Sequence, residues 1–255
     1  MTTIQFIGCG KLGTIFLELF LTSGISKENI SVVTGTPRGT DELAKKYGVR
    51  AGKIENPSLV FLWIKPQQLS EINLEGYNKN TLIISPLAGV KSDKFKTSAT
   101  ICRIMPNILL QYDRGTTLVY KNAESETLNW FLTTLGTKGN IVHCATEDEL
   151  NDLATISGCG PAYFFAFAQA LEELWKEHGG DAGSAKTSIE NLFLGSALYI
   201  TEQKKNFTEA ISTVASKWGI TQKALDTFAE KGLKDMIDAW LREAYKHWNT
   251  LSESA

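Results

Sequence analysis

The sequence predicts an α/β fold in which an N-terminal, doubly wound parallel sheet is followed by a C-terminal all-helical domain. Short apolar runs alternate with helical patterns up to about residue 145, which is typical of a parallel sheet covered by helices. From residue 147 onward the strand signal disappears and only helical patterns remain. We therefore expect one domain over residues 1–145 and a second over residues 146–255.

The strongest motif lies near the N-terminus. An apolar run over residues 4–7 leads into Gly8, Gly10 and Gly13 in the order G-x-G-x-x-G, and a helical pattern follows as far as Gly24. In this motif the first glycine permits a tight turn, the second lets a pyrophosphate approach the backbone, and the third lets the helix lie close to the strand. The motif predicts a Rossmann-type dinucleotide site. Its expected residues are Gly8, Cys9, Gly10, Lys11, Leu12 and Gly13. The alternative is an ordinary strand-to-helix turn in an unrelated α/β domain.

The second predicted strand, residues 29–34, ends where a dinucleotide fold meets the adenosine ribose. Sites that prefer NAD usually carry an acidic residue there, and this chain has none before Asp41. Thr34, Thr36 and Arg38 instead supply hydroxyl groups and a planar cation suited to a phosphate. These residues favour NADP as the cofactor, with NADPH preferred and NADH possible. The alternative is that Arg38 is a solvated residue of a turn over residues 35–39.

Further strands are expected at 59–64, 81–85 and 100–105, and each ends in a small or polar turn. A short helix is expected at 41–47, and another helix at 125–135 lies between apolar segments at 115–120 and 139–142. In open α/β sheets, ligands bind at the carboxyl edge of the strands. We expect the cofactor to contact six residues at these strand ends: Ile64, Lys65, Pro66, Ala88, Gly89 and Asn107. Lys65 fits a strand-end cation facing water equally well.

The second half predicts helices only. Their expected ranges are 147–156, 161–178, 182–203, 207–216, 221–231 and 233–248. The segment 162–168 is apolar on nearly all sides, so it must be buried on more than one side. A small helical domain offers little interior for that, which favours a homodimer with interlocked helical halves, or a higher homo-oligomer. The alternative is an ordinary central core helix.

Composition argues against several classes of protein. A net charge of −2 over 255 residues, with no long basic run, gives no reason to expect nucleic acid or a membrane surface as partner. We expect neither a signal peptide nor a membrane span, since no charged leader or sufficiently long apolar run is present. The four cysteines and three histidines show no ligand or disulfide spacing. The sequence therefore predicts a cytoplasmic protein without a metal site.

Five motifs in register resemble the pyrroline-5-carboxylate reductase family. Residues 7–13 (IGCGKLG) match its nucleotide loop, and residues 64–67 (IKPQ) resemble its A-V-K-P-Q turn. Residues 84–90 (ISPLAGV) resemble I-S-x-x-A-G-I, and residues 103–107 (RIMPN) match R-x-M-P-N. Residues 156–163 (ISGCGPAY) are close to L-S-G-S-G-P-A-Y. The resemblance covers nearly the whole chain.

This resemblance implies NAD(P)H-dependent reduction of the cyclic imine 1-pyrroline-5-carboxylate to L-proline, in proline biosynthesis. It also implies a helical domain that interlocks with a second subunit. The substrate is expected between the nicotinamide, near Ala88 and Gly89, and a loop that reads roughly S-P-G-G-x-T in the family. The corresponding residues here give the expected substrate site: Ser216, Lys217, Gly219 and Thr221.

The substrate loop departs from the family pattern at two positions. Lys217 replaces the proline and Trp218 replaces the first glycine. We expect the helix opened by Thr221 to bind the substrate carboxylate through its N–H groups, and the Thr221 hydroxyl to act in catalysis by contacting the substrate near the imine nitrogen. A plain N-cap role for Thr221 is the alternative.

Two other functions stay open because of the altered loop. One is an NADP-dependent reductase of another imine or of a small carbonyl acid. The other is a non-catalytic NADP-binding homologue that acts through its helical surface.

Overall fold

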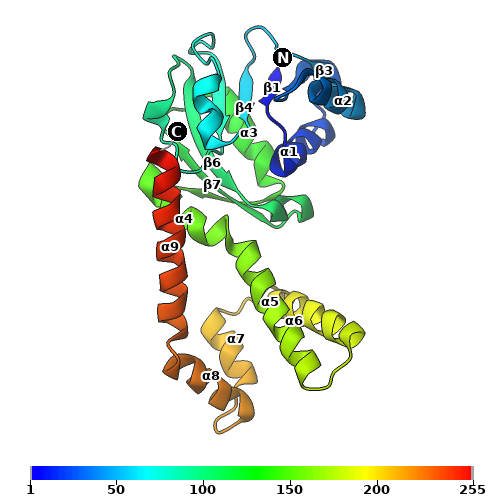
Figure 1. The fold of residues 1–255 in the computed structure, drawn as a ribbon, viewed down its shortest axis with the longest axis vertical. Helices are drawn as coiled ribbons and strands as arrows, with labels where there is room; N and C mark the ends of the chain where they lie inside the picture. The colour runs from blue at the N-terminus through cyan, green and yellow to red at the C-terminus, as the bar shows by residue number, and fades with distance from the viewer. Residues whose placement is uncertain (1, 254–255) are drawn as a thin grey trace. The chain divides into compact units, whose positions relative to one another are not determined.

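The computed structural model describes residues 2–253, which form two compact units (Figure 1). The first unit comprises Met1–Pro161 together with Glu243–Ala255, and the second comprises Ala162–Arg242. The domain boundary expected after residue 145 remains a prediction.

The first unit is built on a single sheet with the strand order β3-β2-β1-β4-β5-β6-β7-β8. The strands, within the described residues, are β1 (Ile4–Ile7), β2 (Ile30–Val33), β3 (Arg50–Ala51), β4 (Leu59–Leu62), β5 (Leu82–Ser85), β6 (Thr100–Pro106), β7 (Gly115–Lys121) and β8 (Gly139–His143). Strands β1 to β6 run parallel to their neighbours. β2 pairs with one edge of β1, and β4 pairs with the opposite edge of β1. This reversal of the strand order makes the carboxyl end of β1 a switch point, where ligands bind in such sheets.

The α/β class and the mostly parallel sheet are confirmed, but the last two strands run the other way. β7 pairs with β6 in antiparallel fashion, and β8 is parallel to β7. The reason is the length of the connection between β6 and β7. Only residues 107–114 separate the two strands, and a parallel crossover needs about a dozen residues or more.

Both faces of the sheet are buried, as the continuous apolar strands require. On one face, α1 (Lys11–Thr22) and α3 (Glu126–Gly136) cover a cluster in which Phe16, Phe20 and Phe131 meet Phe61. The other face holds Val60, Leu62 and Ile83 beneath the segments with the 3-10 helices η2 (Pro66–Glu71) and η3 (Ser92–Lys94). A third cluster forms where α4 (Glu147–Ser157) meets β7.

The helix after β2 starts earlier than predicted. The expected turn at 35–39 is wrong, because α2 (Pro37–Tyr47) already begins at Pro37. The Thr36 side chain caps it by accepting a hydrogen bond from the Gly39 N–H at 3.1 Å. Proline is favoured in the first helical turn, where its missing N–H has no intrahelical partner. Arg38 therefore lies in the first turn of a helix.

The predicted helices of the second half are confirmed. They are α4, α5 (Gly160–Glu177), α6 (Ala182–Gln203), α7 (Phe207–Val214), α8 (Ile220–Glu230) and α9 (Leu233–Glu253). The second unit exposes many large apolar side chains, among them Phe164, Phe167, Leu194 and Val214. None of the helices in residues 2–253 is long and apolar enough to cross a membrane.

Candidate functional site

The turn between β1 and α1 requires glycine for steric reasons. Gly8 has a φ of +79°, and a Cβ built on it would lie 2.2 Å from the carbonyl oxygen of Trp63. A Cβ on Gly13 would lie 3.0 Å from Cγ of the Trp63 ring. Any larger residue at either position would push α1 or the turn away from the end of β4. The two glycines therefore hold the start of α1 against the sheet.

Gly10 differs from Gly8 and Gly13, because the space beside its backbone is open. It is the N-cap of α1, no side chain caps this helix, and a Cβ on Gly10 would meet nothing within 4 Å. The first intrahelical bond runs from Thr14 N–H to the Gly10 carbonyl at 2.9 Å, and N–H groups before it have no intrahelical acceptor. Lys11 adds a cation at the same helix start. A pyrophosphate binds to free N–H groups and needs empty space beside the backbone. The residues here offer both, so they fit the predicted dinucleotide.

Cys9 in the turn and Leu12 in the first turn of α1 are partly buried. The Cys9 Sγ lies 3.9 Å from the Thr14 hydroxyl. Burial raises the pKa of the Cys9 thiol, which keeps it neutral beside the place expected for the phosphates. Such a neutral side chain adds no negative charge to an anion site.

The threonines after β2 stabilise the start of α2. The Thr34 hydroxyl donates to the Thr36 carbonyl at 3.0 Å, while the Thr34 N–H donates to the Thr40 hydroxyl at 2.9 Å. Arg38 projects into solvent, with 89% of its side chain exposed, and its Nε lies 2.7 Å from Glu42 Oε1. An exposed pair of this kind is weak, so it leaves Arg38 able to bind a phosphate. Glu42 was not singled out from the sequence, although its position four residues after Arg38 on a helix is a known pairing distance.

The predicted contacts at the ends of β4, β5 and β6 lie at the same edge of the sheet as Gly8, because these strands are parallel to β1. Ile64, Lys65 and Pro66 follow β4 directly, and the Lys65 N–H donates to Gln68 Oε1 at 3.0 Å. Ala88 and Gly89 follow β5 in a tight turn.

The turn after β5 is well defined. Gly89 has a φ of +76°, and the Val90 N–H donates to the Leu87 carbonyl at 3.3 Å. Ala88 packs against the cluster that contains Leu150 and Ala154 of α4. Ala88 has a small side chain and Gly89 has a left-handed backbone. A contact of this turn with the nicotinamide stays a prediction.

Asn107 is buried and serves the local structure. Its Oδ1 accepts from the Leu109 N–H at 3.1 Å, and its Nδ2 donates to the Ser157 carbonyl at 3.0 Å. The side chain thus connects η4 (Ile108–Tyr112) with the end of α4. A contact with the cofactor stays a prediction for this residue.

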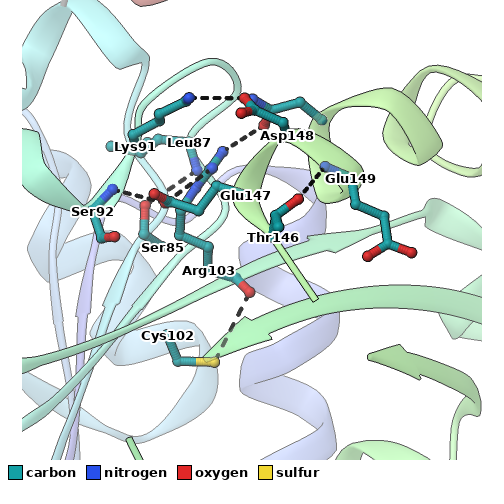
Figure 2. Close-up of polar contacts among 11 residues, drawn as sticks. Ser85, Leu87, Lys91, Ser92, Cys102, Arg103, Thr146, Glu147, Asp148 and Glu149 are labelled. Carbon is teal, nitrogen blue, oxygen red and sulfur yellow. Dashed lines mark hydrogen bonds and ion pairs between the residues drawn. The ribbon is translucent and has the colours of Figure 1, made fainter. Parts of the chain in front are cut away.

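A buried polar cluster next to the Gly89 turn was missed by sequence reasoning (Figure 2). Arg103 on β6 is fully buried; its Nη1 lies 3.2 Å from Glu147 Oε1, and its Nη2 donates to Asn151 Oδ1 at 2.9 Å. Burial lowers the pKa of the Arg103 guanidinium, and the charge of Glu147 opposes that shift. The available signal was an arginine inside an otherwise apolar strand, since such a cation needs a buried partner.

The loop before α8 differs from expectation at its helix start. Gly219, not Thr221, is the N-cap, and Thr221 lies one residue inside the helix. The Gly219 N–H donates to the Ser216 carbonyl at 2.9 Å, and a Cβ on Gly219 would lie 2.5 Å from the Ser216 hydroxyl. The loop therefore folds back closely on Ser216, whose side chain would have to move to admit a larger residue at position 219. No side chain caps α8 either, so its first N–H groups can bind an anion.

Trp218 holds the most unusual backbone of this loop. Its φ is +68°, a left-handed conformation that a tryptophan rarely adopts, and the residue is 91% exposed. The Lys217 Nζ lies 5.9 Å from the centre of the Trp218 ring. Beside these two residues lies a cavity of about 460 Å³, which Gly219, Gln222, Lys223 and Asp226 also line.

The nucleotide residues lie in the first unit, and the loop before α8 lies in the second. Among residues 2–253 there is no group of three or more His, Cys, Asp or Glu residues that could hold a metal ion.

Comparisons with known proteins cover both halves of the chain. Residues 3–89 match the family model described as NADP oxidoreductase coenzyme F420-dependent, and residues 147–251 match that for pyrroline-5-carboxylate reductase dimerisation. A curated pyrroline-5-carboxylate reductase from Corynebacterium melassecola is 28% identical, over 92% of this chain and 93% of its own. The enzyme of that name from Escherichia coli K12 is 27% identical over 98% of both chains.

Solved structures give the same fold over the full length. A pyrroline-5-carboxylate reductase from Coxiella burnetii superposes with a TM-score of 0.83 at 24% identity, covering 98% of both chains. A Plasmodium falciparum pyrroline carboxylate reductase, solved with NADP bound, gives 0.82 at 19% identity over 98% of both chains. The chain is therefore similar to pyrroline-5-carboxylate reductases along its whole length, and residues 147–251 match the model of their dimerisation domain.

Proposed function

We propose that this protein reduces 1-pyrroline-5-carboxylate to L-proline with NADPH, as the last step of proline formation. The observation that carries the proposal is the presence of two uncapped helix starts, at Gly10 and Gly219, in a chain that aligns along its whole length with reductases of that name. One helix start suits the pyrophosphate of the cofactor and the other suits the carboxylate of the substrate.

The first unit binds the cofactor. Backbone N–H groups at the start of α1 receive the pyrophosphate, and Gly10 leaves the space that it occupies. The side chains of Arg38, Thr34 and Thr36 bind the adenosine phosphate. NADPH supplies a hydride, while the protein binds and orients the two reactants.

The second unit binds the substrate through the loop before α8. The N–H groups that follow Gly219 hold the substrate carboxylate, and the Lys217 ammonium adds a charge of opposite sign. Ser216 fixes the loop by accepting the Gly219 N–H. The Thr221 hydroxyl, in the first turn of α8, donates to the substrate near its nitrogen. A protonated imine already accepts a hydride at carbon, so this arrangement needs no strong acid.

The helical unit assembles the enzyme as a homodimer or a higher homo-oligomer. It exposes more large aromatic and aliphatic side chains than a small monomeric unit usually leaves in contact with water. The family model that matches residues 147–251 describes dimerisation. Light scattering at micromolar concentration is expected to give a stable dimer or a higher oligomer. A stable monomer would contradict this assembly. We also keep the prediction of a cytoplasmic location, which fractionation of the source cells tests.

The altered substrate loop keeps two alternatives open: an NADP-dependent reductase of another imine or small carbonyl acid, and an NADP-binding homologue without activity. Their specific support is the exposed Trp218 next to the loop cavity, since the ring can exclude the proline precursor.

The deciding experiment follows NADPH oxidation by the purified protein with and without pyrroline-5-carboxylate. Substrate-dependent oxidation with formation of proline is the expected result. Intact NADPH binding without turnover, in both the wild type and Trp218→Gly, would favour the non-catalytic homologue. Turnover of other imines, without turnover of pyrroline-5-carboxylate, would favour the reductase with a different substrate.

A further inference from the structure

The carboxylate of Glu147 joins two parts of the first unit that are distant in sequence. Its Oε1 accepts a hydrogen bond from the Ser92 N–H at 2.8 Å, and the same atom lies 3.2 Å from Nη1 of Arg103 (Figure 2). Arg103 belongs to strand β6, which is paired on both sides by β5 and β7, and its side chain is fully buried. Ser92 begins η3, three residues after Gly89. One carboxylate therefore connects the turn after β5 to the sheet.

Other contacts attach the same turn to α4. Ala88 packs against the cluster around Leu150 and Ala154, and the Lys91 Nζ lies 2.8 Å from Asp148 Oδ1. The Lys91–Asp148 pair is largely exposed and contributes little. The Glu147 contact differs because its partner cation is buried and cannot be replaced by water.

The direction of the Glu147 bond explains why it controls the turn. A carboxylate only accepts hydrogen bonds, and the bond to Ser92 uses a backbone N–H, whose position moves with the chain itself. Because Arg103 holds the carboxylate, the Ser92 N–H has a single well-defined acceptor. Movement of residues 88–92 away from the sheet would break this bond, while Glu147 would stay paired with Arg103.

We propose that Glu147, held in place by Arg103, is a positioning residue that fixes the Ala88–Gly89 turn against which the nicotinamide ring rests. This inference depends on the proposed function for its catalytic consequence. Glu147 does not touch either reactant. It acts by restricting the position of the turn, so its loss affects the reacting geometry more than the affinity for NADPH.

The sharpest test removes the N–H donor and leaves the buried ion pair intact. Ser92→Pro does this, because proline has no N–H and is tolerated at the first position of a helical segment. The preceding Lys91 has an extended backbone, with φ −74° and ψ 158°, as a residue before proline requires. Ser92→Ala is the matched control, since it keeps the N–H and removes only the hydroxyl.

Three measurements are expected to separate these variants. In Ser92→Pro, the turnover number falls roughly ten- to a hundredfold, as misplacement of reactants by about an ångström predicts. The dissociation constant for NADPH changes less than about twofold, because the contacts at Gly10 and Arg38 remain. Amide hydrogen exchange in residues 88–91 becomes faster, and the deuterium isotope effect on turnover, measured with NADPH labelled at the transferred position, is larger than in Ser92→Ala.

A second variant changes the acceptor of the same hydrogen bond. Glu147→Gln keeps an oxygen acceptor but removes the charge opposite Arg103, and Glu124→Gln is its control at an exposed ion pair of the same unit. We expect faster exchange in residues 88–92 and lower turnover for Glu147→Gln only. This variant also decides the matter if Ser92→Pro does not fold.

The outcomes distinguish this inference from the proposed function. Unchanged hydrogen exchange, turnover and isotope effect in a folded Ser92→Pro or Glu147→Gln protein would overturn the positioning role. A wild-type protein that does not reduce pyrroline-5-carboxylate would overturn the proposed function instead. In that case hydrogen exchange still tests whether Glu147 restrains the turn.

Discussion

The helices α1 and α8 begin in similar ways but use different residues. Each has a glycine N-cap with an extended backbone, at Gly10 and Gly219, and neither is capped by a side chain. Each N-cap also follows a residue with positive φ. Before α1 this residue is Gly8, and before α8 it is Trp218.

The difference shows what the two ligand sites demand. Glycine adopts positive φ without strain, whereas a residue with a Cβ loses roughly 1–2 kcal/mol there. Trp218 is almost fully exposed within its unit, so packing does not offset this strain, and the nearby Lys217 contributes at most about 1 kcal/mol by a cation–π contact. The loop keeps its left-handed geometry at a cost in stability. This favours a functional reason for the geometry over a stabilising one.

The largest effect is expected at Gly8, because two penalties combine there. Gly8→Ala would place a Cβ 2.2 Å from the Trp63 carbonyl oxygen in a backbone conformation that alanine disfavours. We expect the free energy of unfolding to fall by about 3 kcal/mol or more, with loss of NADPH binding. Thermal unfolding and cofactor titration measure both. A stable, NADPH-binding Gly8→Ala protein would contradict the steric account.

Gly10→Ala provides a contrast within the same turn. No atom lies within 4 Å of the new Cβ, so the melting temperature should stay unchanged. The methyl group occupies the space expected for the pyrophosphate, and NADPH affinity should fall roughly ten- to a hundredfold, which corresponds to losing one strong charge-assisted hydrogen bond. Unchanged affinity would show that the pyrophosphate does not bind at this helix start.

The start of α2 differs from those of α1 and α8, because the Thr36 side chain caps it. Here the side chain of Arg38 supplies the positive charge. A charge-assisted bond to a phosphate is worth roughly 1.5–3 kcal/mol, so NADPH should bind about ten- to a hundredfold more tightly than NADH. Arg38→Ala should reduce this ratio, as measured by titrating both cofactors. Glu42→Ala, which frees Arg38 from its partner, is the control and should not reduce it. Equal affinities in the wild type would contradict the predicted preference.

Lys217→Ala tests whether a side chain supplements the free N–H groups of α8. Removal of the ammonium should raise the KM for pyrroline-5-carboxylate by about tenfold while lowering kcat much less, since the lost contact acts on bound substrate and transition state alike. Lys223→Ala removes another cation that lines the same cavity and serves as a comparison. A fall in kcat with constant KM would show that Lys217 does not bind the carboxylate.

Trp218→Gly makes the second helix start resemble the first and is expected to change stability only slightly. Relief of the positive φ outweighs the added freedom of glycine in the unfolded chain, for a net gain of up to about 1 kcal/mol. Denaturant unfolding measures this gain, and a loss of stability would mean that the ring makes favourable contacts. The activity of the same variant is a separate result. A large increase would indicate that Trp218 restricts access for pyrroline-5-carboxylate.

The sequence predicted most of the fold because local patterns determine it. The apolar run before Gly8 and the helices after residue 147 follow directly from residue periodicity. The direction of β7 is not local information, since it depends on the short connection after Asn107. The early start of α2 was available in the pair Thr36–Pro37, a common helix start, and was overlooked.

The site was predicted in part for similar reasons. The glycines of the β1–α1 turn were expected from their spacing, and their steric roles agree with the geometry. The Arg103–Glu147 pair was missed because the two residues are 44 positions apart and meet only in the folded sheet. The left-handed Trp218 could not be expected, because residue type argues against that conformation.

The return of α9 to the first unit has a consequence for folding during synthesis. Trp248 belongs to the same buried cluster as Leu118, Leu150 and Ala154, so part of the core next to β7 comes from residues made after the whole helical unit. Domains usually fold as they leave the ribosome, N-terminal part first. Here the N-terminal unit emerges with an apolar surface that stays uncovered until the residues from Glu243 onward follow. A ribosome stalled before that point would display a nucleotide-binding unit with an unfinished core, which is a substrate for chaperones.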